Sequence, residues 1–155
     1  MKKPEEFHIV DKEDIYFFYD LVMNQGSKSI KNRKSISFIS SKYGIEIKIE
    51  KAGTCKSIQP VKDSITIFDE NKSLNERFFS HLRNAFAHCY IEISENRCRF
   101  IDWNAYIENK KCKFGKNRIT LLGDVNYDDF KKMMDEFLSD ISLKKQKANK
   151  NDKTA

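Results

Sequence analysis

The chain contains little proline and glycine, with 2 prolines and 5 glycines among its 155 residues. This scarcity argues against a loop-rich all-β fold and against an intrinsically disordered chain. Long apolar runs are also missing. No stretch approaches the ~20 residues that a membrane span requires, and the amino-terminal segment lacks the apolar core of a secretory signal. We therefore expect a cytoplasmic protein that does not enter a membrane.

The sequence also lacks the patterns that hold cofactors. Its 4 cysteines show no CxxC spacing and are interpreted as reduced, partly buried thiols: Cys55, Cys89, Cys98 and Cys112. A Walker-type phosphate loop, a GxGxxG turn and the nucleophile elbow of a serine hydrolase are all missing. The sequence thus predicts no bound cofactor and no metal.

The composition that is present, 39% hydrophobic and 34% charged, is typical of a globular domain large enough to bury a core without disulfides. We predict one domain over residues 1–143. Residues 144–155 hold five lysines against Asp152 alone, so four units of the formal net charge of +6 lie in this tail. Such a tail is typically a solvated, disordered end, and its alternative role is a non-specific arm for phosphate backbones.

The best-defined helix of the sequence covers residues 73–90. Ser73 can cap its first turn, and Glu76 three residues later completes a capping box. Apolar residues recur at steps of three and four, as on one buried helical face: Leu74, Phe78, Leu82, Ala85, Phe86 and Cys89. A neighbouring polar stripe carries Arg77, His81, Asn84 and His88. The helix therefore offers both a core face and residues suited to chemistry.

Near the end of this helix, Arg83 and Asn84 are followed by three residues and then by His88. The arrangement resembles the signature of the HEPN superfamily, in which an arginine and a polar residue precede a histidine late in a bundle helix. The phrase LRNAFAH is similar to the final helix of small prokaryotic members. Many relatives have glycine after the histidine, where this chain has Cys89.

The resemblance implies a fold, partners and an activity. HEPN domains are up-and-down helical bundles, often with β insertions, and their protomers pair through the signature helix. We therefore expect a homodimer through residues 73–90. HEPN ribonucleases cut RNA as toxins or anti-phage effectors, so RNA is the implied substrate, and an antitoxin or a nucleotidyltransferase is the implied protein partner.

The rest of the chain predicts further helices and a hairpin. Helical patterns cover residues 11–23, 27–43 and 127–142. Residues 45–50 alternate as a strand, residues 64–68 fit a strand or the first turns of a helix, and residues 90–101 predict a β-hairpin. We predict a mainly α fold of the α+β class: an antiparallel helical bundle of HEPN type with a β-hairpin region before the last helix.

The spacing of the signature residues suggests their roles. Asn84 and His88 are four apart and share a helical face, so the amide can orient the imidazole. Arg83 lies about 140° around the helix from His88, and a second copy of the helix could complete the cleft. Histidine exchanges protons near neutrality, with an unperturbed pKa of about 6.5, and arginine's planar fork suits a phosphate. We assign His88 as general acid and base, Arg83 as phosphate clamp and Asn84 as orienting residue.

This residue set supports metal-independent cleavage of RNA, in which the 2′-hydroxyl attacks the adjacent phosphorus and leaves a 2′,3′-cyclic phosphate. His81 shares the face of Asn84 and His88 and is an accessory candidate, although a structural or exposed histidine is the commoner outcome. His81 and His88 lie about 10 Å apart along a helix, too far for one zinc ion with ligand bonds of about 2 Å.

The functional prediction is therefore a HEPN-type endoribonuclease. The alternative is a non-catalytic module, in which the same helix forms a dimer or binds RNA or a partner protein. In that case Arg83 could instead form a surface ion pair with Glu76 or Asp69.

Overall fold

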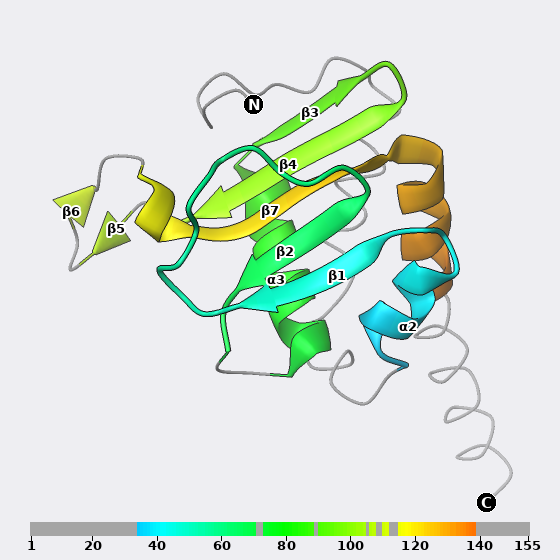
Figure 1. The fold of residues 1–155 in the computed structure, drawn as a ribbon, viewed down its shortest axis with the longest axis horizontal. Helices are drawn as coiled ribbons and strands as arrows, with labels where there is room; N and C mark the ends of the chain where they lie inside the picture. Colours follow the sequence, from blue (N-terminus) through cyan, green and yellow to red (C-terminus); the bar gives the residue numbers. More distant parts are fainter. Residues whose placement is uncertain are drawn as a thin grey trace, which may run out of the picture.

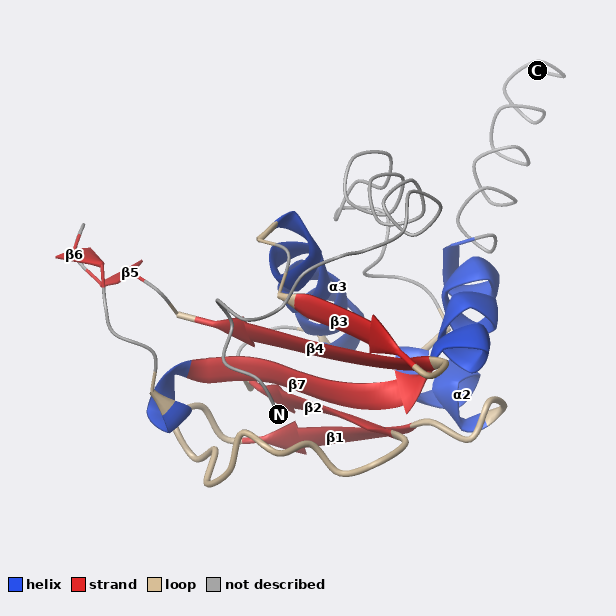
Figure 2. Ribbon diagram, turned by 90° about the horizontal axis from the view of Figure 1, so that it is seen from above, coloured by secondary structure: helices blue, strands red, loops and turns tan. Residues whose placement is uncertain are grey.

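The computed structural model describes residues 34–70, 73–88, 90–104, 106–107, 110–111 and 115–138. Its centre is a five-stranded mixed sheet in the order β1-β2-β7-β4-β3, with the described helices on one face (Figures 1 and 2). The strands are β1 (Glu46–Glu50), β2 (Ser64–Phe68), β3 (Ile91–Ser94), β4 (Arg97–Trp103) and β7 (Ile119–Asn126).

Three helical segments cover that face: α2 (Ile36–Ser41), α3 (Leu74–Ala87) and a helix over residues 127–138, orange and unlabelled in Figure 1. The last helix directly follows β7, and the Asn126 side chain caps it by accepting a hydrogen bond from the Asp129 backbone at 3.0 Å. A small hairpin of β5 (Tyr106–Ile107) and β6 (Lys110–Lys111) and a 3-10 turn, η3 (Lys116–Arg118), precede β7.

Strand pairing makes β7 the centre of the sheet. It runs antiparallel to both β2 and β4, whereas β1 and β2 run parallel. Residues 51–63 connect these two parallel strands and cross the face opposite the helices (Figure 2). Because β7 is covered on both faces, residues 121–125 are all buried, as expected for a central strand.

The predicted hairpin is present as β3 and β4. Its two-residue turn is formed by Glu95 and Asn96, both with positive φ (53° and 58°), which matches the right-handed twist of the flanking strands. The predicted strand at residues 45–50 is confirmed as β1, and residues 64–68 form a strand rather than a helix.

The core lies between the sheet and α3, as the apolar stripe of this helix predicts. The stripe residues buried there are Phe78, Leu82, Ala85 and Phe86. The Phe86 ring meets those of Phe100 and Phe130 edge to face, with centroids 6.4 and 6.2 Å apart. Gly123 of β7 makes room for this packing, since a Cβ there would collide with the Phe100 ring.

The predicted helical bundle is wrong: the chain forms an α+β fold in which helices cover a mixed sheet. Three apolar segments supply strands that pair over long distances, for example Ser64 with Asp124. Once β1, β2 and β7 align, the helices bury their apolar faces against the sheet more than against one another. The sheet is thus the framework of the domain. The predicted β3–β4 hairpin is one part of this sheet.

Some predictions concern residues outside the described ranges. The helix at residues 11–23 and the tail at 144–155 are among them, together with the first part of the predicted helix at 27–43. Its last part is the short helix α2, capped by Ser35. The last predicted helix is described as far as residue 138.

Candidate functional site

Helix α3 begins and ends where local chemistry requires. The Ser73 hydroxyl accepts a hydrogen bond from the Glu76 backbone at 3.3 Å, as predicted for the cap. At the other end His88 is the C-cap residue, and its backbone N–H donates to the Asn84 carbonyl at 3.0 Å. The signature residues therefore occupy the last turn and a half of the helix.

These residues share the outer surface of α3. Asn84, Ala87 and His88 are exposed and Arg83 is half-buried, whereas Leu82, Ala85 and Phe86 between them face the core. The core packing of α3 thus leaves the carboxyl-terminal half of the polar stripe facing outward.

Arg83 makes an aromatic contact rather than the ion pair considered from sequence. Its guanidinium lies 5.8 Å from the centroid of the Phe79 ring, a cation–π distance. Its Nε is buried and has no hydrogen-bond partner among the described residues. In the described part of the chain, neither Glu76 nor Asp69 forms an ion pair with it.

His88 stacks on an aromatic ring. Its imidazole lies 5.6 Å from the ring of Tyr90 at an interplanar angle of 27°, and Tyr90 in turn lies 6.4 Å from Trp103 of β4. Arg83 and His88 thus contact different aromatic partners, Phe79 and Tyr90. Among the described residues, no contact within one chain joins the two signature side chains.

His81, the accessory candidate, is held between two carboxylates. Its Nδ1 lies 2.8 Å from Asp102 Oδ2 and its Nε2 lies 3.1 Å from Asp69 Oδ2. Asp102 projects from β4, Asp69 follows β2, and the same Asp102 oxygen accepts a hydrogen bond from the Thr120 hydroxyl at 2.8 Å. Through one imidazole, helix α3 is therefore tied to β4 and to the segment after β2, and Asp102 extends the connection to β7.

The protonation of His81 follows from these contacts. Burial disfavours the imidazolium, but the hydrogen bonds and negative charges of Asp102 and Asp69 outweigh it and raise the pKa of His81 above its ordinary value. An imidazolium donates from both nitrogens, which matches a carboxylate on each side. Neither nitrogen is left to exchange a proton with a substrate, so this geometry indicates a structural histidine.

Arg77, one turn earlier, strengthens the same junction, which is the contact of α3 with Asp69 and Asp102. Its side chain is 8% exposed, and its Nη1 donates to the backbone carbonyl of Asp69. The polar stripe of the helix therefore divides: Arg77 and His81 face the sheet, whereas Asn84 and His88 face outward.

The sequence analysis missed the carboxylates that hold His81. Asp69 follows β2, whereas Asp102 and Thr120 lie on β4 and β7, and no spacing in the sequence connects them to His81. One signal was available for Asp102. It lies in the apolar run Phe100-Ile101-Asp102-Trp103, and a carboxylate in a buried strand requires a partner.

Two findings bear on other classes of site. Within the described ranges, no group of three or more His, Cys, Asp or Glu side chains could hold a metal ion. Of the helices that the structure describes, none has the length and apolarity to cross a membrane.

Comparison with known proteins gives one match. The sequence model of a family described as HEPN pEK499 p136 matches residues 12–149, nearly the whole chain. No curated protein and no solved structure matches.

Proposed function

Because the chain belongs to the HEPN superfamily, in the family HEPN pEK499 p136, we propose that it is a metal-independent endoribonuclease. The observation that carries the proposal is the exposure of Asn84 and His88, with Arg83 beside them, on the outer surface of α3. A strand of RNA could reach these groups without any rearrangement of the core.

In this reaction His88 accepts the proton of the 2′-hydroxyl as its oxygen attacks the adjacent phosphorus. The bond from phosphorus to the 5′-oxygen breaks, and that oxygen leaves with a proton supplied by the acid form of the histidine. The products are a 2′,3′-cyclic phosphate and a 5′-hydroxyl. Arg83 offsets the charge that develops on the phosphate, and Asn84 orients the imidazole.

The active site is completed by a second copy of the chain. Arg83 and His88 contact different rings within one protomer, while both lie on the outer surface of α3. Pairing two α3 helices across this surface brings the arginine of one copy to the histidine of the other. The half-buried guanidinium, whose Nε has no hydrogen-bond partner among the described residues, gains a phosphate or a partner group in the process.

The first experiment is cleavage of RNA by the purified protein in excess EDTA. We expect wild-type protein to produce cyclic phosphate ends, and His88→Ala and Arg83→Ala to lose about 10²- to 10⁴-fold in rate. Lys132→Ala, an exposed charge removed from the last helix, is the matched control and should cut normally. Equal cleavage by wild type and all three variants would contradict the assignment of Arg83 and His88 as catalytic residues.

Mixing the two inactive variants tests the composite site. If each site takes Arg83 from one copy and His88 from the other, an equal mixture of Arg83→Ala and His88→Ala should recover about a quarter of wild-type activity, because half of the random pairs are mixed and each holds one intact site. A site contained in one protomer would show no recovery.

A role as a toxin or an anti-phage effector is tested by expression in growing bacteria. Wild-type protein should depress growth, and His88→Ala should relieve the effect at equal protein level. If wild type is tolerated and RNA stays intact although the protein binds it, the chain is a non-catalytic RNA-binding module instead.

A further inference from the structure

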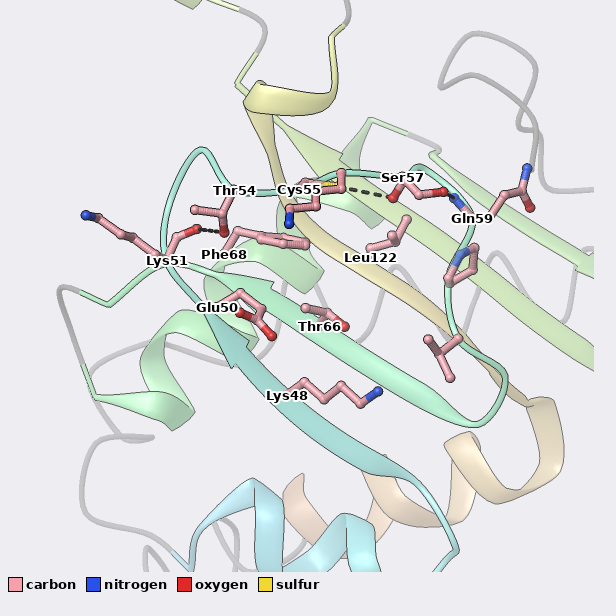
Figure 3. Close-up of a pocket in the computed structure, with 13 residues that line it drawn as sticks. Lys48, Glu50, Lys51, Thr54, Cys55, Ser57, Gln59, Thr66, Phe68 and Leu122 are labelled. Atoms are coloured by element: carbon pink, nitrogen blue, oxygen red, sulfur yellow. Dashed lines mark hydrogen bonds between the residues drawn. The ribbon is translucent and has the colours of Figure 1, made fainter.

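The face of the sheet opposite the helices carries a hollow that the signature helix does not use. It has a volume of about 560 Å³ and lies between the strands β1, β2 and β7 and the segment that joins β1 to β2 (Figure 3). Thr66, Phe68 and Leu122 form its floor, and its size is that of a small-ligand site.

Local hydrogen bonds give the roof of the hollow a defined shape. The Thr54 backbone and hydroxyl both donate to the Lys51 carbonyl, at 3.2 and 2.6 Å. The Cys55 thiol donates to the Ser57 carbonyl at 3.2 Å, and the Gln59 backbone donates to the Ser57 hydroxyl at 3.1 Å (Figure 3). The hollow is therefore a built feature of the fold rather than a gap beneath an unconstrained loop.

The charge around the hollow is positive. Lys48, Lys51 and Lys56 line it, against the single carboxylate of Glu50. Lys48 lies 4.0 Å from Glu46, at the limit of an ion pair, and in the described part of the chain no carboxylate pairs with Lys51 or Lys56. Burial raises the pKa of the Cys55 thiol, which therefore adds no negative charge. Unpaired ammonium groups around a hollow favour phosphate groups.

A second hollow of about 250 Å³ adjoins the first, because Phe68 lines both. Arg118 and Asn104 belong to its walls, and the Arg118 carbonyl accepts a hydrogen bond from the Asn104 backbone at 2.9 Å. Positive charge thus extends along the face from the lysines to Arg118.

Aromatic side chains continue the line toward the signature helix. Phe68 and Ile119, which line the second hollow, belong to the apolar cluster on which Tyr90 and Trp103 pack. Tyr90 then stacks on His88. Phe68 thus joins the two hollows, and the apolar cluster to which it belongs reaches Tyr90, which contacts His88.

We propose that the single-stranded RNA substrate is bound over several nucleotides along a path from the lysine-lined hollow past Arg118 and around the β3 edge of the sheet, beside Tyr90, to the phosphodiester at His88. The proposal rests on the proposed function for its substrate and names a binding surface away from the reacting atoms. Alternating cations and aromatic rings are typical of surfaces for single strands, whose phosphates need charge and whose bases need flat apolar contacts. The bases of a duplex are paired and stacked, so they cannot enter hollows of this size.

Binding is measured with a fluorescein-labelled RNA of about 12 nucleotides, a length within the usual site sizes, carrying 2′-O-methyl groups so that it cannot be cut. We expect Lys48→Gln, Lys51→Gln and Lys56→Gln combined to weaken binding about tenfold or more and to flatten the slope of log affinity against log salt by about 2. The control carries the same charge change on the helical side, as Lys34→Gln, Lys131→Gln and Lys132→Gln, and should keep most of its affinity. Equal losses in the two triple variants would overturn the proposal, as would equal binding of a duplex of the same sequence.

A cleavage experiment separates this surface from the catalytic site. A dinucleotide substrate reaches only His88, so wild type and the triple variant of Lys48, Lys51 and Lys56 should cut it equally. The triple variant should cut a long RNA more slowly than wild type does. Loss of dinucleotide cleavage in the variant would place the lysines in the reaction and contradict the proposal. If wild type cuts neither RNA, the ribonuclease assignment fails, while the binding experiment still decides whether this face takes RNA.

Discussion

The two halves of helix α3 carry the same kinds of polar residue and use them differently. From the first turns to the middle of the helix, Arg77 and His81 are turned toward the sheet and engaged by Asp69 and Asp102. In the second half, Asn84 and His88 face outward. A histidine's role therefore depends on what the sheet presents to it, since the two imidazoles are seven residues apart on one helix.

The same comparison explains how an exposed signature can be held firmly. The amino-terminal half of α3 is tied to β4, to β7 and to the segment after β2 by His81 and its partners. Apolar packing of Phe78 and Phe79 adds to this attachment. The carboxyl-terminal half can then leave its polar groups in solvent without loosening the helix.

The largest expected effect comes from removing the carboxylate that serves both His81 and Thr120. Asp102→Ala leaves the imidazole Nδ1 and the Thr120 hydroxyl without their acceptor, so we expect the free energy of unfolding to fall by about 3 kcal/mol. Urea denaturation followed by circular dichroism measures it. Asp135→Ala, an exposed carboxylate on the last helix, is the control and should change stability by less than about 0.5 kcal/mol. A similar small loss in Asp102→Ala would contradict the structural role of the junction.

Replacement of His81 should cost about 2 kcal/mol, with a pH dependence of known sign. The raised pKa of His81, caused by Asp102 and Asp69 against the effect of burial, means that the folded state holds the proton more tightly than the unfolded state. Its stabilisation is therefore fully present below the unfolded pKa of about 6.5 and is lost as the pH rises through the folded pKa. The difference in unfolding free energy between wild type and His81→Gln, measured from pH 5.5 upward in small steps by urea titration, should narrow as the pH rises. A difference that widens with pH would show that the neutral imidazole is the bound form.

A smaller effect is expected from the hydroxyl alone. Thr120→Val keeps the shape of the side chain and removes one hydrogen bond to Asp102, so the loss should be about 1 kcal/mol. In a double-mutant cycle, Thr120→Val should cost almost nothing once Asp102 has become alanine. Full additivity of the two losses would mean that the hydroxyl acts elsewhere.

The smallest effect on stability is expected at the other histidine. His88→Ala removes an exposed ring stacked on Tyr90, so the free energy of unfolding should change by no more than about 0.5 kcal/mol. Thermal unfolding of the variant beside wild type measures this change. The result matters because the same variant is expected to lose RNA cleavage, and a stable but inactive protein separates chemistry from folding. A loss of several kcal/mol would instead make His88 a structural residue.

Local patterns in the sequence predicted much of α3. The cap at Ser73, the apolar stripe and the family signature near Arg83 and His88 are all defined within short segments, and the structure and the family match confirm the helix, its core face and the superfamily. The β-hairpin over residues 90–101 was predicted for the same reason, since a hairpin is a local feature, and the structure places its two-residue turn at Glu95 and Asn96. The catalytic roles of the signature residues stay predictions.

The architecture was predicted wrongly because it depends on pairing over long distances. No residue pattern near β1 or β2 indicates that β7, more than fifty residues later, pairs with β2. Ser64, for example, pairs with Asp124. The sequence predicts β1 and the β3–β4 hairpin and allows a strand at β2, but helical segments of similar strength suggest a bundle. The sheet forms because the strand backbones hydrogen-bond to one another. Side-chain periodicity does not indicate which strands pair in this way.

By itself, the sequence determined where α3 begins, which of its faces is apolar and which family the chain belongs to, because capping, helical periodicity and a short signature are properties of neighbouring residues. Only the tertiary structure decided that His81 is held between Asp69 and Asp102 while His88 faces outward. That distinction depends on the assembled strands β2, β4 and β7, since a carboxylate selects one of two similar imidazoles only when the fold brings it within hydrogen-bonding distance.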